Sequence, residues 1–440
     1  MGRLLIVSPN FPPVNAPDMH RVRMSLPHFE ASGWQPFVLA LSPEEQAFGI
    51  EPALAQSLPD VPVSRVAALP LRITRPLGIG NAGLRAMGHL YRAGADLIRR
   101  ESIDLVYFST TMFPVMSLGR LWKQRFGVPY VLDMQDPWVS DYAPSPDAPP
   151  ALKRRLVNAL HRVLEPFTMR RVDGLVAVSE AYNVTLRERY PWITSDMCVT
   201  LPFGVNESDF DVARSLPWRN TTFDPADGHL HGVSVGRGGD DLRIAASILF
   251  RALQRVSASN PASQPVHLSF VGTDYAPVAL QRRTIEPVAI AEGLGPSVCE
   301  HPSRVPYFAG LRLMLDADFL VLLGSDDRQY SPSKIYPYLA ARRPIVAVLH
   351  ENSPVADLIT ASGAGVVVKY ASALDTDRAV NTLAAACADL FFRLPIDLSG
   401  EVRALRSLTA PHLTHRQCEL FDAVLRRRAS PTELPCHESQ

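Results

Sequence analysis

The 440-residue chain has few cysteines, and their spacing excludes the common cysteine-based sites. The five cysteines are scattered and odd in number, and they form neither a CxxC pair nor a cysteine–histidine cluster. This pattern argues against a disulfide framework and a zinc site, and it favours a reducing compartment. We therefore expect a cytoplasmic protein and predict no metal ligands.

Long apolar runs are absent as well. No run approaches the roughly 20 residues that span a bilayer, and the chain starts directly with a strand-like run at residues 4–7. The N-terminus has neither the basic segment nor the cleavage site of a signal peptide. The sequence thus predicts neither a membrane-spanning helix nor a secretion signal.

The chain carries no excess of charge of either sign. Lysine plus arginine and aspartate plus glutamate both number 44, so we expect no bulk electrostatic attraction to nucleic acid. Hydrophobic residues make up 47% and charged residues 20%, which excludes a disordered chain and allows sizeable hydrophobic cores. Prolines are abundant and cluster in expected loops, as at residues 143–150.

Short apolar runs alternate with helical patterns along the chain. The runs predict strands at residues 4–8, 37–41, 61–67, 105–109, 130–134 and 175–179, and in the second half at residues 233–236, 267–271, 319–323, 345–349 and 365–368. They are mostly continuous rather than alternating, which is typical of parallel strands buried on both faces. The alternation predicts an α/β fold with two doubly wound, Rossmann-like sheets.

Apolar residues at helical spacing predict helices between these strands. Three sets each share one helical face: Met19, Val22, Leu26 and Phe29; Leu152, Leu156, Leu160, Val163 and Phe167; and Ile244, Ile248, Leu249, Leu253 and Val256. We predict an N-terminal domain over residues 1–205, a C-terminal domain over residues 206–405 and a final segment over residues 406–440. A helix at residues 413–428 is expected to pack back on the N-terminal domain, and the polar tail after Ser430 is expected to be disordered.

Two loops of the first half follow predicted strands and carry polar side chains. In open α/β sheets, ligands bind beyond the carboxyl ends of the strands. After the first strand, Asp18 is placed to cap a helix, with His20 and Arg21 in its first turn. After the strand at residues 130–134 come Asp136 and Trp138, a carboxylate and an indole that suit a hydroxyl-rich ligand. For both loops the alternative is an ordinary capped turn.

A glycine-rich loop follows the first strand of the second half, with the order Gly236-Arg237-Gly238-Gly239. Glycines let the backbone approach an anion closely, and a helix N-terminus with Arg237 supplies positive potential. The alternative is a plain glycine turn, because the loop is neither GxGxxG nor a Walker loop.

A further loop of this half has the order Ser331-Pro332-Ser333-Lys334. Ser331 resembles an N-cap, Pro332 suits the first helical position, and Lys334 adds a point charge for phosphate. The alternative is an ordinary cap with a solvated lysine. Together, this loop and the glycine-rich loop offer two helix N-termini and two cations, which suit a diphosphate.

The predicted helix at residues 152–167 belongs to a basic segment, residues 151–171. Its cations and histidine are Lys153, Arg154, Arg155, His161, Arg162, Arg170 and Arg171. A basic amphipathic helix can lie on anionic lipid, so this segment is a candidate for peripheral membrane contact. The alternative is a solvated face over the core.

Six stretches, in order, resemble the family 4 type of glycosyltransferases with the two-domain GT-B architecture. They are LLIVSPNFPP…HRV, VPYVLDMQDPW, VDGLVAVSEAYNVTLRERYP, LPFGVNESDF, VSVGRGG and SPSKIYPYLAARRPIVAV. The resemblance spans residues 4–368. It implies two Rossmann-like domains that face each other across a cleft.

The resemblance also implies an activity and roles for residues. The co-substrate is a nucleotide-diphosphate sugar held mainly by the C-terminal domain, and the acceptor is a glycan, a lipid or a small molecule. Such enzymes typically retain anomeric configuration and need neither a metal nor another cofactor. The implied catalytic residues are Arg237, Lys334 and Asp136; the implied donor-binding residues are Gly236, Gly238, Gly239, Ser331, Ser333 and Asp326; and the implied acceptor-side residues are Asp18, His20, Arg21 and Trp138. Arg237 and Lys334 would stabilise the leaving diphosphate.

The sequence departs from the family pattern at several of its usual positions. Gln135 stands where many members have histidine, and an amide cannot act as a general base. Gln329 and Pro337 stand where the E-x7-E pattern has its acids, so donor recognition is altered or uses other groups such as Asp326. Ala16 and Pro17 replace a usual Gly-Gly pair.

Three hypotheses follow from these observations. The first is an active glycosyltransferase that builds a polysaccharide, glycolipid or related glycan. The second is a non-catalytic binding or scaffold protein that keeps the fold. The third is a sugar-nucleotide epimerase, although the sequence offers no convincing acid/base set for that reaction.

Overall fold

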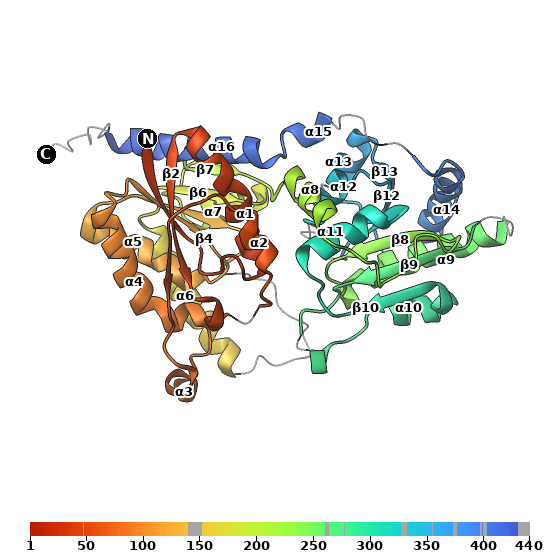
Figure 1. The fold of residues 1–440 in the computed structure, drawn as a ribbon, viewed down its shortest axis with the longest axis horizontal. Helices are drawn as coiled ribbons and strands as arrows, with labels where there is room; N and C mark the ends of the chain where they lie inside the picture. Colours follow the sequence, from red (N-terminus) through yellow and green to blue (C-terminus); the bar gives the residue numbers. More distant parts are fainter. Residues whose placement is uncertain are drawn as a thin grey trace, which may run out of the picture. The chain divides into compact units, whose positions relative to one another are not determined.

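The computed structural model describes most of the chain. The described residues are 1–46, 48–139, 152–259, 264–276, 278–326, 332–353, 355–372, 376–396, 398 and 403–429. Four sequence-based predictions lie outside them: the proline-rich loop at residues 143–150, Gln329, Ser331 and the tail after Ser430. Contacts divide the chain into unit 1, Met1–Phe203 with Ala410–Gln440, and unit 2, Gly204–Thr409 (Figure 1).

Unit 1 is built on a parallel sheet of seven strands in the order β3-β2-β1-β4-β5-β6-β7. The strands are β1 (Gly2–Val7), β2 (Trp34–Leu41), β3 (Val63–Val66), β4 (Leu105–Ser109), β5 (Tyr130–Met134), β6 (Gly174–Ala177) and β7 (Cys198–Thr200). The central strands are buried on both faces, as their continuous apolar runs predict. β7 has no such run, and the sequence pattern missed it.

Helices cover this sheet. They are α1 (His20–Ser25), α2 (Pro52–Gln56), α3 (Leu71–Thr74), α4 (Ala82–Arg100), α5 (Ser117–Phe126), α6 (Leu152–Met169), α7 (Glu180–Arg189) and α16 (Ala410–Ala429). The predicted helix after β1 is shorter than its pattern, because α1 gives way to a 3-10 turn at Leu26–His28 that contains Pro27. Its apolar face is nevertheless buried, with Met19, Val22 and Phe29 fully inaccessible.

The C-terminal helix α16 belongs to unit 1 and closes one of its cores. Phe421 lies at its centre, with ring centroids 5.5 Å from Trp34 and 5.3 Å from Tyr107. Trp34 Nε1 donates to Asp422 Oδ1 at 3.1 Å. Residues from both ends of the chain therefore share one core, and this core supports the loop after β1.

Unit 2 is built on a parallel sheet of six strands in the order β10-β9-β8-β11-β12-β13. The strands are β8 (Leu230–Val235), β9 (Val266–Val271), β10 (Val298–His301), β11 (Phe319–Leu323), β12 (Ile345–His350) and β13 (Gly365–Tyr370). The helices are α8 (Glu207–Ser215), α9 (Arg243–Ser259), α10 (Glu286–Ala291), α11 (Tyr307–Asp316), α12 (Ile335–Ala341), α13 (Val355–Ser362), α14 (Thr376–Phe392) and α15 (Arg403–Arg406).

The core of unit 2 follows the predicted pattern along α9, where Ile248, Leu249 and Leu253 are buried. The sequence pattern missed β10, an edge strand with the mixed sequence VCEH. Both units thus have the doubly wound parallel sheet that the sequence predicted. Among the described residues, no helix has the length and the apolar character needed to cross a membrane.

Candidate functional site

The strand order of unit 2 reverses between β8 and β11, which pair at the middle of the sheet. From β8 the sheet grows toward β9 and β10 on one side, and from β11 toward β12 and β13 on the other. In open α/β sheets, ligands bind beyond the carboxyl ends of the strands at such a switch point. The loop after β8 holds Gly236 to Gly239, and the loop after β11 begins with Gly324, Ser325 and Asp326.

The glycine-rich loop needs its glycines for backbone geometry. Gly236 and Gly239 have φ angles of +122° and +145°, a region that other residues rarely adopt. The loop is also tied to its neighbours, because Gly238 N donates to Thr273 O at 2.8 Å and Gly239 N donates to Thr284 Oγ1 at 2.9 Å. The loop is therefore held in place before any ligand arrives.

Arg237 forms an ion pair with Asp241 within this loop. Nη1 lies 3.0 Å from Oδ1, and Nη2 lies 2.6 Å from Oδ2. Burial opposes the charged carboxylate, but hydrogen bonds from Arg237 and Ser325 and the arginine charge lower the pKa of Asp241. The backbone oxygen of Asp241 also accepts from Asp326 N at 3.0 Å. Asp241 thus connects the loops after β8 and β11.

Lys334 lies beside the same loop. Its Nζ is 3.4 Å from Ser234 Oγ, and a Cβ on Gly236 would be 3.9 Å from its side chain. Burial, and next the charge of Arg237, lower the pKa of Lys334 to about 8, while Asp241 opposes this shift. The structure therefore brings the two predicted cations together.

The start of the next helix differs from the prediction. Helix α12 begins at Ile335 with Lys334 as its N-cap residue, so Pro332 is not its first position. Ser333 is exposed in the preceding turn, and Asp326 is exposed at the end of the loop after β11. The donor-binding roles of Ser333, Asp326 and the three loop glycines stay predictions.

In unit 1, Asp18 ties two loops together instead of capping a helix. It lies in a 3-10 turn, Pro17–Met19, whose N-cap makes no side-chain bond. Oδ1 accepts from Asn10 Nδ2 at 2.8 Å, and Oδ2 accepts from Thr111 N at 3.0 Å and from Thr110 Oγ1 at 3.2 Å. The buried carboxylate therefore joins the loops after β1 and β4, at the point where this sheet reverses its strand order.

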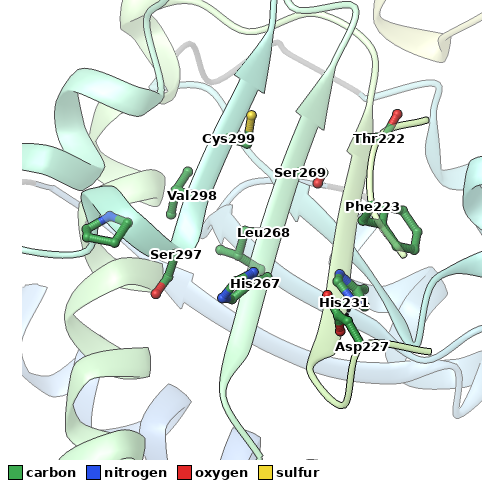
Figure 2. A pocket seen from close by; sticks show the side chains of 11 residues that line it. Thr222, Phe223, Asp227, His231, His267, Leu268, Ser269, Ser297, Val298 and Cys299 are labelled. Carbon is green, nitrogen blue, oxygen red and sulfur yellow. Dashed lines mark hydrogen bonds and ion pairs between the residues drawn. The ribbon is translucent and has the colours of Figure 1, made fainter. Parts of the chain in front are cut away.

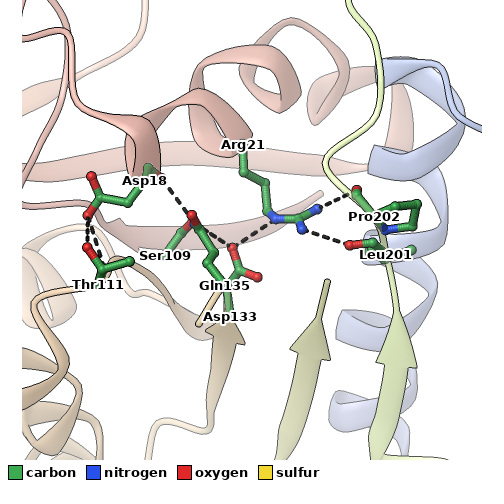
Figure 3. A network of polar contacts seen from close by, with 8 residues as sticks. All are labelled: Asp18, Arg21, Ser109, Thr111, Asp133, Gln135, Leu201 and Pro202. Carbon is green, nitrogen blue, oxygen red and sulfur yellow. Dashed lines mark hydrogen bonds and ion pairs between the residues drawn. The ribbon is translucent and has the colours of Figure 1, made fainter. Parts of the chain in front are cut away.

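Arg21 belongs to the same buried network (Figure 3). Its Nε lies 2.9 Å from Asp133 Oδ2, and its Nη2 and Nη1 donate to the carbonyls of Leu201 and Pro202 at 2.7 and 3.2 Å. Arg21 is 3% exposed and Asp133 is fully buried. The family resemblance implied that Arg21 lies on an acceptor surface. In the structure, its guanidinium nitrogens instead bind other groups of unit 1.

Gln135 completes this network. Its amide nitrogen donates to Asp18 O, Ser109 Oγ and Asp133 Oδ2, each at 3.0 Å. The amide nitrogen has two protons to share among these three acceptors, whereas an imidazole nitrogen has at most one. The glutamine therefore has a structural role that its sequence position alone did not indicate.

The remaining residues predicted on unit 1 have different surroundings. His20 is half-buried, and its Nδ1 accepts a long bond from Arg23 at 3.4 Å. Trp138 is buried, and its ring stacks on that of Phe113 with 5.5 Å between the centroids. The ring face toward Phe113 is therefore used in core packing. Asp136 is exposed, yet desolvation by nearby protein atoms and the charge of Asp18 raise its pKa.

Comparison with known families identifies part of the chain. Residues 20–204 match the model of a family described as a glycosyl transferase 4-like domain. This stretch covers most of unit 1. Over these residues the chain is similar to glycosyl transferase 4-like domains. The match confirms the resemblance found in the sequence, and no curated protein matches the chain.

Solved structures extend the likeness to the whole chain. A glycosyltransferase from Rickettsia africae shares 13% identity with a TM-score of 0.59, and the match covers 97% of this chain and 99% of that one. Anabaena HepE, solved with UDP and glucose, gives 13% identity and a TM-score of 0.56, covering 96% and 100%. The UDP-GlcNAc 2-epimerase from Methanocaldococcus jannaschii gives 13% and 0.52, also covering 96% and 100%.

At this level of identity the solved structures share a fold with the chain. The fold is that of GT-B glycosyltransferases, as the sequence predicted. The glycosyl transferase 4-like domain and this fold together support classification of the protein as a glycosyltransferase.

A cavity of about 240 Å³ lies elsewhere in unit 2, outside the glycosyl transferase 4-like domain (Figure 2). It is lined by the first residues of β8, β9 and β10, including His231, His267 and Val298, so it lies toward the amino ends of these strands. His231 Nε2 is 2.9 Å from Asp227 Oδ1. No group of three metal-ligating side chains occurs within the described ranges, here or elsewhere. This cavity lies away from the switch point and holds none of the predicted donor residues.

Proposed function

We propose that the protein transfers a sugar from a nucleotide-diphosphate donor, with a uridine diphosphate sugar as the first candidate. The proposal rests mainly on two cations, Arg237 and Lys334, which lie beside the glycine-rich loop at the switch point of unit 2. Two cations and a close-approaching backbone match the charge of a diphosphate. The complex of HepE with UDP and glucose supports the choice of nucleotide.

This site would stabilise the nucleoside diphosphate as the leaving group of the reaction. As the bond from the sugar to the diphosphate breaks, negative charge grows on the phosphate oxygens. Arg237 and Lys334 would stabilise the transition state, in which this charge is larger, more than the ground state. This difference would lower the activation barrier of the transfer. Because two cations can offset the charge of the diphosphate, we propose a metal-independent reaction. We further propose that the reaction retains anomeric configuration and uses a glycan or lipid-linked acceptor.

Turnover tests this proposal directly. Release of nucleoside diphosphate from a panel of nucleotide sugars is expected in the wild type, and Arg237→Ala or Lys334→Ala should lower the rate by about a hundredfold or more, as for other lost oxyanion contacts. Arg393→Ala removes an exposed arginine of unit 2 that lies outside both predicted donor loops and should leave the rate unchanged. A wild type that neither binds nor turns over any donor would overturn the proposal.

A second candidate is a protein that binds the donor without transfer. Gln135 favours it, because the residue that replaces the family's usual histidine is fully used in the buried network of unit 1. In that case nucleotide sugars would bind and protect the protein from unfolding, but no diphosphate would be released in the presence of any acceptor.

We further propose that unit 1 contacts an anionic membrane through α6. Along its first three turns, α6 exposes an apolar stripe: Leu156 is 64% and Val163 is 66% exposed. Arg155 and Arg162 are exposed on the same helix, and residues 152–164 contain no acid. The sequence pattern predicted this apolar face, and the structure leaves this part of it uncovered. An apolar stripe flanked by cations fits a lipid surface with anionic headgroups.

A second element has the same character. At α3, Leu71 and Ile73 are 49% and 55% exposed, and Arg72 and Arg75 are exposed beside them. Figure 1 shows α3 and the first turns of α6 at the same end of unit 1. Residues 69–76 contain no acid either. The second element adds exposed apolar side chains that a bilayer interface could take up.

Cosedimentation with vesicles tests this contact. The wild type should bind phosphatidylglycerol-containing vesicles and not pure phosphatidylcholine, and Leu156→Asp with Val163→Asp should weaken binding by more than about tenfold, since each buried side chain contributes on the order of 1–2 kcal/mol. Ile290→Asp is the matched control, because it changes an apolar residue of unit 2 that is 62% exposed. Equal binding by the double variant would refute a role for α6.

A further inference from the structure

Asp241 is an acid beside the glycine-rich loop that neither the sequence motifs nor the family pattern singled out. It holds both terminal nitrogens of Arg237, and this bidentate geometry fixes the plane of the guanidinium as well as its position. The loop is built around this pair. A Cβ on Gly239 would lie 2.3 Å from Asp241 Oδ1 and 2.9 Å from Arg237 Nη1, so any larger residue would break it.

Charge balance gives Asp241 a second effect. Arg237 and Lys334 lie close enough for the arginine to lower the pKa of the lysine, and Asp241 acts in the opposite direction. Among the described residues, other titratable groups of this region include Asp240, next to Asp241, Asp326, after β11, and Tyr370, on β13. The pKa of Tyr370 is raised to about 12 by burial and next by Asp326 and Asp241. Tyr370 stays neutral below that pH, so the carboxylates supply the charge that offsets the two cations.

We propose that Asp241 is a positioning residue of the donor site: it orients the guanidinium of Arg237 for the diphosphate and keeps Lys334 charged beside it. The assignment rests on the proposed function, since the diphosphate is the ligand that both cations would serve. Asp241 itself touches no reacting atom. It acts through Arg237 by geometry and through Lys334 by charge.

The variant Asp241→Asn should lower kcat/KM with a nucleotide-sugar donor by about ten- to a hundredfold, the loss expected when a contact group is misplaced by an ångström. Asp240→Asn is the matched control, because it removes the same charge from the neighbouring exposed acid. Equal losses in both variants would overturn the proposal.

A second readout does not depend on turnover. The reactivity of the Lys334 amine toward an acylating reagent, followed by mass spectrometry across pH, reports when this amine loses its proton. Its midpoint should move to lower pH in Asp241→Asn and stay close to the wild-type value in Asp241→Glu, which keeps the charge but alters the pair. The Glu variant should still lose kcat/KM, because its longer side chain displaces the guanidinium.

These measurements distinguish a failure of the proposed function from a failure of the role assigned to Asp241. A wild type without turnover on any donor would refute the proposed function, while the labelling midpoints would still test the charge effect of Asp241. A midpoint that does not move in Asp241→Asn, or that moves to higher pH, would overturn the assignment even in an active enzyme. Midpoints measured on protein that keeps its melting transition exclude unfolding as the cause.

Discussion

Replacing Arg21 by methionine should lower the free energy of unfolding of unit 1 by about 3–5 kcal/mol. Asp133 is fully buried, and Arg21 is the cation that the structure pairs with it. Methionine fills a similar volume but leaves the carboxylate buried without a positive partner. It also removes the donors to the carbonyls of Leu201 and Pro202. The cost of an uncompensated buried charge therefore dominates the effect.

Tryptophan fluorescence during denaturant unfolding measures this loss. Four of the five tryptophans, Trp34, Trp122, Trp138 and Trp192, lie in unit 1, so the signal reports mainly on that unit. Arg99→Met is the control, because Arg99 is an exposed arginine with a long contact of 3.9 Å to Asp96, and it should change stability by no more than about 0.5 kcal/mol. If Arg21→Met were as stable as the control but inactive, Arg21 would belong to acceptor binding instead.

The second large effect is expected at Lys334, where function and stability should respond in opposite directions. Lys334→Met should weaken the binding of uridine diphosphate by about a hundredfold, because a charge-assisted phosphate contact is lost. The same change should stabilise the ligand-free protein at neutral pH. The folded state lowers the pKa of Lys334 from the usual 10.5 to about 8, so the folded state disfavours the charged amine.

The pH dependence of this stabilisation follows from the linkage between proton binding and folding. Below about pH 8 the lysine is charged in both folded and unfolded states, and its desolvation costs stability by roughly 2–3 kcal/mol, allowing for its partial exposure. The cost declines as the pH rises from about 8 toward 10.5. Lys334→Met should therefore exceed the wild type in stability at pH 6.5 and match it more closely at pH 10. A variant less stable than the wild type at pH 6.5 would contradict this account.

Most of the sheet strands that the sequence predicted have continuous apolar runs, and β3 is an exception. In β4, β5 and β11 every residue is buried, so composition alone carries the signal. The edge strands β7 and β10 were missed because their exposed positions admit Thr200 or Cys299, which interrupt the apolar run. Helix α6 was predicted from its apolar spacing, but spacing cannot tell whether Leu156 meets a core or solvent.

The candidate residues of the two units were predictable to different degrees. The glycine-rich loop and Lys334 have local signatures, because a positive φ favours glycine and a phosphate favours a cation near a helix start. The partners of the unit 1 residues have none. Arg21 meets Asp133, 112 positions away, and Asp18 meets Thr110 and Thr111, so only the folded sheet brings these groups together.

We propose that unit 2 holds a nucleotide diphosphate between Arg237 and Lys334. The most direct measurement is the melting temperature of the wild type and of Lys334→Met with and without a series of nucleoside diphosphates. A ligand that binds only the folded state raises the melting temperature by mass action. We predict a concentration-dependent rise with at least one diphosphate in the wild type and little or none in Lys334→Met. No rise with any diphosphate in the wild type, or an equal rise in the variant, would contradict the account.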